Sequence, residues 1–236
     1  MNMATRFQDR SEAGKLLAEQ LTKYADRTDV LVLGLPRGGV PVGFEVAKAL
    51  NAPLDVFIVR KLGVPGHEEL AMGAIATGGV RVLNHAVVRA IGIPDNVIET
   101  VSAKEQLELK RREQVYRGDA PAFEVGGQTI ILVDDGIATG STMLAAVAAL
   151  KQRRPARIVV AAPAAPASSC DELEQEVNEV VVVMRPHPFY AVGQVYEVFG
   201  QTSDAEVRDL LSRSKRVTCF DEHEASRRNP APNSAD

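Results

Sequence analysis

Two adjacent carboxylates, Asp134 and Asp135, stand between an apolar run and a turn rich in glycine and hydroxyl residues. The apolar run, 130–133, is typical of a strand that is buried on both faces. The turn after the carboxylates leads at Thr142 into a second apolar stretch, 143–150, which indicates a helix. Such a turn directs backbone N–H groups and small hydroxyls at one point, with the positive end of the helix behind them. We therefore predict a phosphate site in this turn.

The phosphate-binding residues that we expect are Gly136, Ile137, Ala138, Thr139, Gly140, Ser141 and Thr142. The two carboxylates upstream do not suit that phosphate, because like charges repel one another. They suit the hydroxyl groups of a sugar, or a Mg²⁺ ion reached through water. A sugar phosphate is therefore the ligand that this stretch predicts.

The segment 130–142 resembles the phosphoribosyl-pyrophosphate (PRPP) loop of type I phosphoribosyltransferases. That loop consists of an apolar strand, two acidic residues and a short Thr-Gly-Ser/Thr phosphate turn. The segment is not a nucleotide P-loop, since no Gly-x-x-x-x-Gly-Lys-[Ser/Thr] pattern occurs. An acidic but otherwise ordinary strand–turn–helix connection is the alternative. Over about residues 6–213, the chain most resembles uncharacterised bacterial phosphoribosyltransferase-like proteins.

Basic residues follow two further apolar runs, at 30–35 and 54–59, and open folds of this kind bind ligands at the carboxyl ends of strands. The candidate pyrophosphate-binding residues are Arg37, Gly38, Gly39, Arg60 and Lys61. The resemblance implies that Arg37 and the two glycines form the pyrophosphate loop, in which a non-proline cis peptide often precedes the position of Arg37. A solvated turn residue is the simpler interpretation of Arg37 alone. Convergence with the acidic turn favours pyrophosphate binding.

The order of apolar runs and helical patterns predicts an α/β fold with repeated βαβ units. The expected core strands are 30–35, 54–59, 130–133, 158–162 and 180–184. We expect a doubly wound, mainly parallel five-stranded sheet in one domain over residues 1–217. Within it, we assign 62–127 to a lid hairpin and helix insertion and 185–217 to a small hood. The polar residues 218–236 indicate a disordered tail.

The insertion contains a candidate hairpin, 71–75 with 80–83, and a long helix that begins near Pro94 and ends near Arg117. Many members of the resembled family carry a mobile loop in this region. Basic residues on the long helix are one feature of proteins that bind RNA or DNA. Glutamates interleaved at helical spacing, together with a net charge of −4, favour a solvated, salt-bridged face instead.

The base that would accept the phosphoribosyl group is left open by the sequence. Phe189 and Tyr190 are adjacent aromatics in the expected hood, and either could stack on a planar ring. Packing of this loop against the core is the alternative. Hypoxanthine/guanine enzymes of the family have an aspartate at the position of Ala138, and alanine cannot exchange a proton with a purine. The resemblance therefore disfavours that subclass.

Composition limits the remaining choices. The N-terminus lacks an apolar signal core, and no apolar run approaches the length that spans a membrane. Cys170 and Cys219 are isolated, which favours a reduced, cytoplasmic protein without a membrane partner. We expect Mg²⁺ as cofactor, held by PRPP and water near the two carboxylates without direct protein ligands. A homodimer is compatible with these features.

The resemblance implies transfer of phosphoribose from PRPP to a nitrogenous base with release of pyrophosphate. Asp134 and Asp135 would grip the ribose hydroxyls, and Arg37 would stabilise the leaving group. A regulator that senses PRPP or a nucleotide without turning it over is the main alternative. We see no additional N-terminal DNA-binding domain or net basic charge to support it. Hydrolysis of a phosphorylated sugar in the same pocket is a third option.

Overall fold

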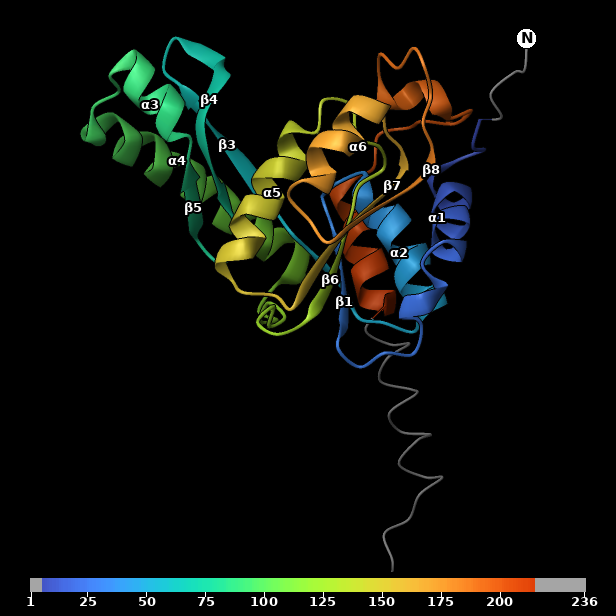
Figure 1. Cartoon of the computed structure of the whole chain (residues 1–236). Helices are drawn as coiled ribbons and strands as arrows, with labels where there is room; N and C mark the ends of the chain where they lie inside the picture. Colours follow the sequence, from blue (N-terminus) through green and yellow to red (C-terminus); the bar gives the residue numbers. More distant parts are fainter. Residues whose placement is uncertain (1–5, 215–236) are drawn as a thin grey trace, which may run out of the picture.

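The computed structural model describes residues 6–214, and a parallel sheet forms its centre (Figure 1). Its strands are β1 (Val30–Gly34), β2 (Leu54–Val56), β6 (Thr129–Val133), β7 (Arg157–Ala164) and β8 (Glu179–Met184). They lie in the order β2-β1-β6-β7-β8, and all four neighbouring pairs are parallel. The predicted α/β fold with a five-stranded parallel core is confirmed.

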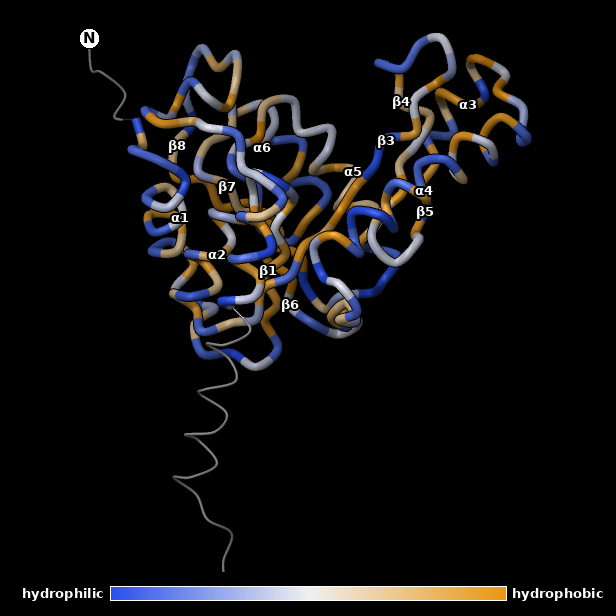
Figure 2. The backbone as a smooth tube through the Cα atoms, turned by 180° about the vertical axis from the view of Figure 1, so that it is seen from behind, coloured by the Kyte–Doolittle hydropathy of each residue, from blue (hydrophilic) through white to orange (hydrophobic). Residues whose placement is uncertain are grey.

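Helices cover both faces of this sheet because successive strand residues point to opposite sides. Val30 and Val32 of β1 pack with helices α1 (Arg10–Glu19) and α2 (Gly39–Leu50). Leu31 and Leu33 instead join the cluster of α5 (Ser141–Gln152) and α6 (Ala167–Glu174). A helix over residues 204–214 also packs on the α2 side. Figure 2 shows the apolar strands running between these layers.

A second, antiparallel sheet forms a separate arm of the molecule, at the upper left of Figure 1. It contains β3 (Val59–Val64), β4 (His67–Ala76) and β5 (Val80–Leu83), and helices α3 (His85–Ile91) and α4 (Asp95–Arg117) follow it. The predicted hairpin and long helix are both present here. The short helix α3 had no clear signal in the sequence.

The apolar run 54–59 is divided between the two sheets, which differs from the single strand that its sequence predicts. β2 ends at Val56, and β3 begins at Val59 in the other sheet. Phe57 and Ile58 connect them and are fully buried, so the run stays apolar throughout. The insertion therefore begins at residue 59 instead of 62, and Arg60 and Lys61 belong to it.

The hood is the segment after β8, and it packs on the start of the chain. It includes the short 3-10 helix η2 (Val192–Val195), and Phe7 pairs with Tyr196 in an isolated parallel bridge. Another 3-10 helix, η1 (Thr22–Tyr24), follows α1. None of the helices within residues 6–214 is long and apolar enough to cross a membrane. The predicted tail, 218–236, and Cys219 lie outside the described residues.

Candidate functional site

The two predicted ligand loops meet at the carboxyl ends of β1 and β6, which are neighbouring strands. Gly38 lies so close to the side chain of Asp135 that a methyl group on Gly38 would overlap Asp135 Oδ2. A Cβ atom on Gly39 would stand 2.5 Å from the carbonyl oxygen of Val133 and 2.9 Å from Cα of Asp134. Only glycine permits this approach, so the predicted pyrophosphate loop and the acidic pair lie in direct contact.

The loop that carries Arg37 is fixed to the sheet by its backbone. The amide of Leu35 donates to the Val133 carbonyl at 2.8 Å, and that of Gly39 donates to the Leu35 carbonyl at 2.9 Å. The Pro36–Arg37 peptide is cis, as the resemblance leads us to expect. Arg37 then extends towards Asp204, with 3.8 Å between Nη1 and Oδ1.

The two carboxylates of the acidic pair have different surroundings. Oδ1 of Asp134 accepts a hydrogen bond of 2.9 Å from the amide of Asp135. Desolvation raises the pKa of Asp134 well above its usual value, and the neighbouring charge of Asp135 raises it further. Oδ2 of Asp135 instead accepts a hydrogen bond of 2.7 Å from Nε of Arg10. A cation thus neutralises one member of the pair, while the other resists ionisation.

Arg10 connects the acidic pair to the hood. Besides its bond to Asp135, it donates from Nη1 to the carbonyl of Gly200 at 2.7 Å. Its guanidinium lies 4.1 Å from the centre of the Phe199 ring, a distance suited to a cation–π contact. Tyr196 completes the arrangement by donating its hydroxyl to the carbonyl of Asp135 at 2.6 Å.

The predicted phosphate turn leads directly into α5, whose first residue is Ser141. Gly140 has φ of +74°, a left-handed conformation that disfavours other residues. The amide of Ile137 donates to the Ala164 carbonyl at 2.8 Å, and Ser169 Oγ donates to the carbonyl of Ala138 at 2.9 Å. These bonds from β7 and α6 hold the backbone of the turn in place at the N-terminus of α5.

A cavity of about 310 Å³ lies where the hood meets the two loops. Its walls are Arg10, Arg37, Gly38, Asp135 and residues 199–202 of the hood. The lining therefore combines two guanidinium groups, one carboxylate and one aromatic ring. This arrangement suits a ligand with hydroxyl and anionic groups.

Arg60 and Lys61 lie apart from this cavity, on β3 of the second sheet. Nη2 of Arg60 forms an ion pair of 2.6 Å with Glu105 of α4, and Lys61 lines the same separate cavity as Arg60. Within residues 6–214, neither residue forms a hydrogen bond or an ion pair with the acidic turn. The prediction that they directly end a core strand is wrong, because β2 ends at Val56 and both residues lie within β3.

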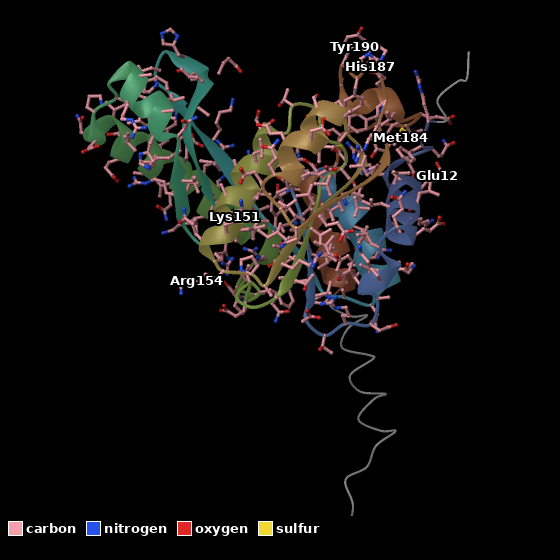
Figure 3. The ribbon with its side chains drawn as sticks, viewed as in Figure 1. Glu12, Lys151, Arg154, Met184, His187 and Tyr190 are labelled. Carbon is pink, nitrogen blue, oxygen red and sulfur yellow. The ribbon has the colours of Figure 1, made fainter. Side chains whose placement is uncertain are left out.

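The two candidate stacking residues of the hood, Phe189 and Tyr190, differ in how far they are buried. Phe189 is partly buried and packs against the cluster that contains Phe7 and Tyr196. Tyr190 is 83% exposed and stands at the outer end of the hood (Figure 3). Phe199 is the aromatic ring that lines the cavity beside Asp135.

Four site residues had no signal in the sequence: Arg10, Tyr196, Phe199 and Asp204. Each is distant from residues 134–142 along the chain, and tertiary packing alone unites them with that segment. Asp9, which caps α1 through its side chain, predicts where that helix begins but not that Arg10 would point into the site.

The site offers oxygen ligands to a cation but no complete set. Asp134 and Asp135 are hard donors of the type that Mg²⁺ prefers. Within residues 6–214, however, no group of three or more histidine, cysteine, aspartate or glutamate side chains is arranged to hold a metal. The residues present therefore fit a Mg²⁺ ion that takes its ligands from a substrate and from water beside the two carboxylates.

Known proteins resemble this chain in sequence and in fold. The model of the phosphoribosyl transferase domain family matches residues 5–193. A Mycobacterium tuberculosis H37Rv protein, whose name places it among the phosphoribosyl transferases, is 46% identical over 210 residues. The match covers 89% of this chain and 47% of that protein, so the chain spans about half the length of this relative. The crystal structure of TT1426 from Thermus thermophilus is 41% identical, with a TM-score of 0.79, over 88% of this chain and 98% of that one.

Proposed function

The chain belongs to the phosphoribosyl transferase domain family, and from this we propose that it transfers phosphoribose from PRPP to a nitrogenous base. In this reaction the anomeric carbon forms a bond to a ring nitrogen of the base. The bond from that carbon to pyrophosphate breaks, and its electron pair leaves with the pyrophosphate. The ring nitrogen gives up its proton, which passes to the departing pyrophosphate or to water. The transition state has positive charge on the ribose and growing negative charge on the leaving group.

The acidic pair serves the ribose in this proposal. Asp134 and Asp135 accept hydrogen bonds from the ribose hydroxyls, and their charge favours the cationic ring. Burial and the neighbouring charge of Asp135 raise the pKa of Asp134, so the folded protein shifts this carboxyl towards its neutral form. Positive charge on the ribose ring acts against this shift. The charged form of Asp134 is therefore more stable in the transition-state complex than in the ligand-free protein.

The 5′-phosphate lies in the turn from Gly136 to Thr142 in this proposal. Backbone N–H groups at the start of α5 point towards that position, and the Thr139 and Ser141 hydroxyls, 3.2 Å apart, stand beside it. Because the turn is braced by Ser169, it needs little rearrangement on binding.

The leaving group faces the loop of Arg37, Gly38 and Gly39. Hydrogen bonds to the sheet hold the backbone of this loop before the reaction, and a preorganised position for the Arg37 charge is the condition for effective electrostatic catalysis. Mg²⁺, bound to PRPP oxygens and water near the acidic pair, would neutralise further charge on the pyrophosphate. Arg60 and Lys61 remain proposed cations for this group, but Arg60 must first leave Glu105.

The close approach of Gly38 to Asp135 supports this function most strongly. It brings the part of the site that suits a ribose next to the part that suits pyrophosphate. PRPP carries pyrophosphate on the carbon beside its 2-hydroxyl, so a site for it requires such a junction. A general phosphate-binding turn has no such requirement.

A non-catalytic PRPP or nucleotide sensor is the second candidate, and two observations favour it. Arg10 already occupies one oxygen of Asp135, and Ala138 provides no acid or base for an acceptor. The identity of the acceptor, a homodimeric state and a cytoplasmic location are likewise proposals that rest on the sequence. Phe189 and Tyr190 remain candidates for base stacking, and Phe199 is now a third.

Formation of a nucleoside monophosphate distinguishes a transferase from a sensor. The protein should be incubated with PRPP, Mg²⁺ and each of adenine, guanine, uracil and orotate, and the mixture analysed for a nucleoside monophosphate by mass spectrometry. We expect one base to yield product and the Asp134→Asn, Asp135→Asn double variant to yield none. Product from no base, with PRPP still bound by the wild type, supports the sensor.

A further inference from the structure

A second cavity, of about 240 Å³, lies beside the pyrophosphate loop and collects three guanidinium groups. Its lining residues are Arg37, Arg111, Arg112, Val115, Tyr116 and Asp204. Arg37 also lines the cavity of the acidic pair, so the two cavities meet at this side chain. Helix α4, which belongs to the insertion, thereby brings two further cations to the outer side of Arg37.

The arginines of this cavity have unused hydrogen-bond donors. Arg112 donates from Nε to Glu108 at 2.8 Å, and its two terminal nitrogens form no hydrogen bond within residues 6–214. The 3.8 Å between Arg37 Nη1 and Asp204 Oδ1 exceeds hydrogen-bonding distance. Arg111 uses Nε and Nη2 on the same Glu108. The unused N–H groups form the planar fork that phosphate oxygens accept.

We infer that Arg112, assisted by Arg111, forms the outer half of a pyrophosphate site whose inner half is the Arg37 loop. The loop holds the phosphate attached to the ribose, and α4 holds the terminal phosphate. Pyrophosphate carries more negative charge than one guanidinium balances, so further cations at this point are expected. That the bound pyrophosphate is the one attached to the ribose of PRPP rests on the proposed function, whereas affinity for free pyrophosphate does not.

Two carboxylates, Glu108 and Asp204, affect the arginines and the charge of this site in different ways. Glu108 accepts hydrogen bonds from Nε of both Arg111 and Arg112. The terminal nitrogens of Arg112 are not used in this contact and stay available for a ligand. Asp204 lines the cavity and accepts a hydrogen bond of 2.9 Å from Tyr116. Burial and this bond raise the pKa of Tyr116 to about 12, so the phenol stays a donor. As a fixed negative charge, Asp204 should oppose a bound anion.

The test compares calorimetric titrations with inorganic pyrophosphate, PRPP and ribose 5-phosphate. For Arg112→Gln we expect about 5- to 20-fold weaker binding of pyrophosphate and PRPP, because a charge-assisted contact at a partly exposed site is lost. Ribose 5-phosphate should bind unchanged. Lys110→Gln removes the same charge from an exposed neighbour outside the cavity and should have no such effect.

Two further variants separate this site from a merely structural helix. Arg112→Lys keeps the charge without the planar fork and should restore part of the affinity. Asp204→Asn keeps a hydrogen-bond acceptor for Tyr116 and should strengthen pyrophosphate binding about 3- to 10-fold. If Arg112→Gln binds pyrophosphate and PRPP like the wild type, the inference is wrong, although the proposed function stands. Wild-type binding of pyrophosphate without any binding of PRPP or ribose 5-phosphate would contradict the proposed function alone.

Discussion

Arg10 Nε donates a 2.7 Å hydrogen bond to Asp135 Oδ2, and the two side chains are only 14% and 13% exposed. The pair joins the first turn of α1 to the turn after β6, across 125 positions of the chain. Arg10 also carries the contact to Gly200 of the hood. One guanidinium thus fixes both a carboxylate of the proposed ribose site and the segment that covers it.

Replacement of Arg10 by glutamine should therefore weaken both stability and binding. The loss of one partner leaves the Asp135 charge partly buried and unpaired, which we expect to cost about 2 to 4 kcal/mol of unfolding free energy. Thermal and urea unfolding measure this cost. Arg27→Gln, which breaks an exposed ion pair with Asp29, is the matched control and should cost under about 1 kcal/mol. Equal costs for the two variants would show that the Arg10 pair has no special role.

Gly38→Ala should disrupt the site without requiring an unusual backbone angle. The φ of Gly38 is −62°, which any residue adopts, so the new methyl group acts only through its overlap with Asp135. We expect a loss of about 1 to 3 kcal/mol in stability, together with strongly reduced PRPP affinity. Gly126→Ala, whose Cβ would come no closer than 3.7 Å to the Arg153 carbonyl, is the control. Unchanged PRPP affinity in Gly38→Ala would mean that this junction does not form the binding site.

Gly140→Ala tests the phosphate turn through its backbone. Alanine has room there, since the nearest atom, Ser169 Cβ, is 3.7 Å away, but φ of +74° strains any residue with a side chain. The strain should cost about 1 to 2 kcal/mol and should weaken binding of ribose 5-phosphate as the turn relaxes. Gly140→Val should be worse on both counts. Calorimetry with ribose 5-phosphate decides, and wild-type affinity in either variant would exclude this turn as the phosphate site.

The raised pKa of Asp134 gives a pH-dependent prediction. An aspartate whose pKa is raised by folding adds stability below its unfolded pKa, near 3.8, and loses that contribution as pH rises through the folded value. Asp134→Asn should therefore be more stable than the wild type at about pH 8, with a difference that shrinks towards about pH 4.

Thermal unfolding without ligand, over this pH range, measures the effect of Asp134→Asn. The control is Asp171→Asn, at an exposed position of α6, which should show no such trend. A stability difference that grows as the pH falls would contradict the assigned surroundings of Asp134. The same variant should bind PRPP less well, because an amide replaces a carboxylate that accepts hydrogen bonds from the ribose hydroxyls.

The sequence predicts those parts of the site that are contiguous in the chain. The strand, acidic pair, turn and helix of 130–150 follow one another, and local patterns determine each of them. The contacts of Arg10 and Tyr196 with Asp135 depend on how α1 and the hood pack, for which one sequence contains no signal.

The error at residues 54–59 has a physical cause. Strands of both sheets need apolar residues here, and the buried connection through Phe57 and Ile58 is apolar as well. Hydrophobic pattern alone therefore does not reveal where the chain leaves one sheet for the other. For this reason the pattern places Arg60 and Lys61 at the end of a core strand, whereas they lie within β3.

The central claim is that the site promotes departure of pyrophosphate, and Arg37→Ala tests it most directly. A catalyst stabilises charge that develops only as the leaving group departs, so the variant should lose more rate than affinity. With the accepting base and saturating PRPP, we predict that kcat for pyrophosphate release falls by about 10²- to 10³-fold. The Kd for PRPP should rise by less than about tenfold, since Gly38, Gly39 and the phosphate turn still bind it. A rise in Kd with no change in kcat, or wild-type protein that binds PRPP and releases no pyrophosphate with any base, would contradict the claim.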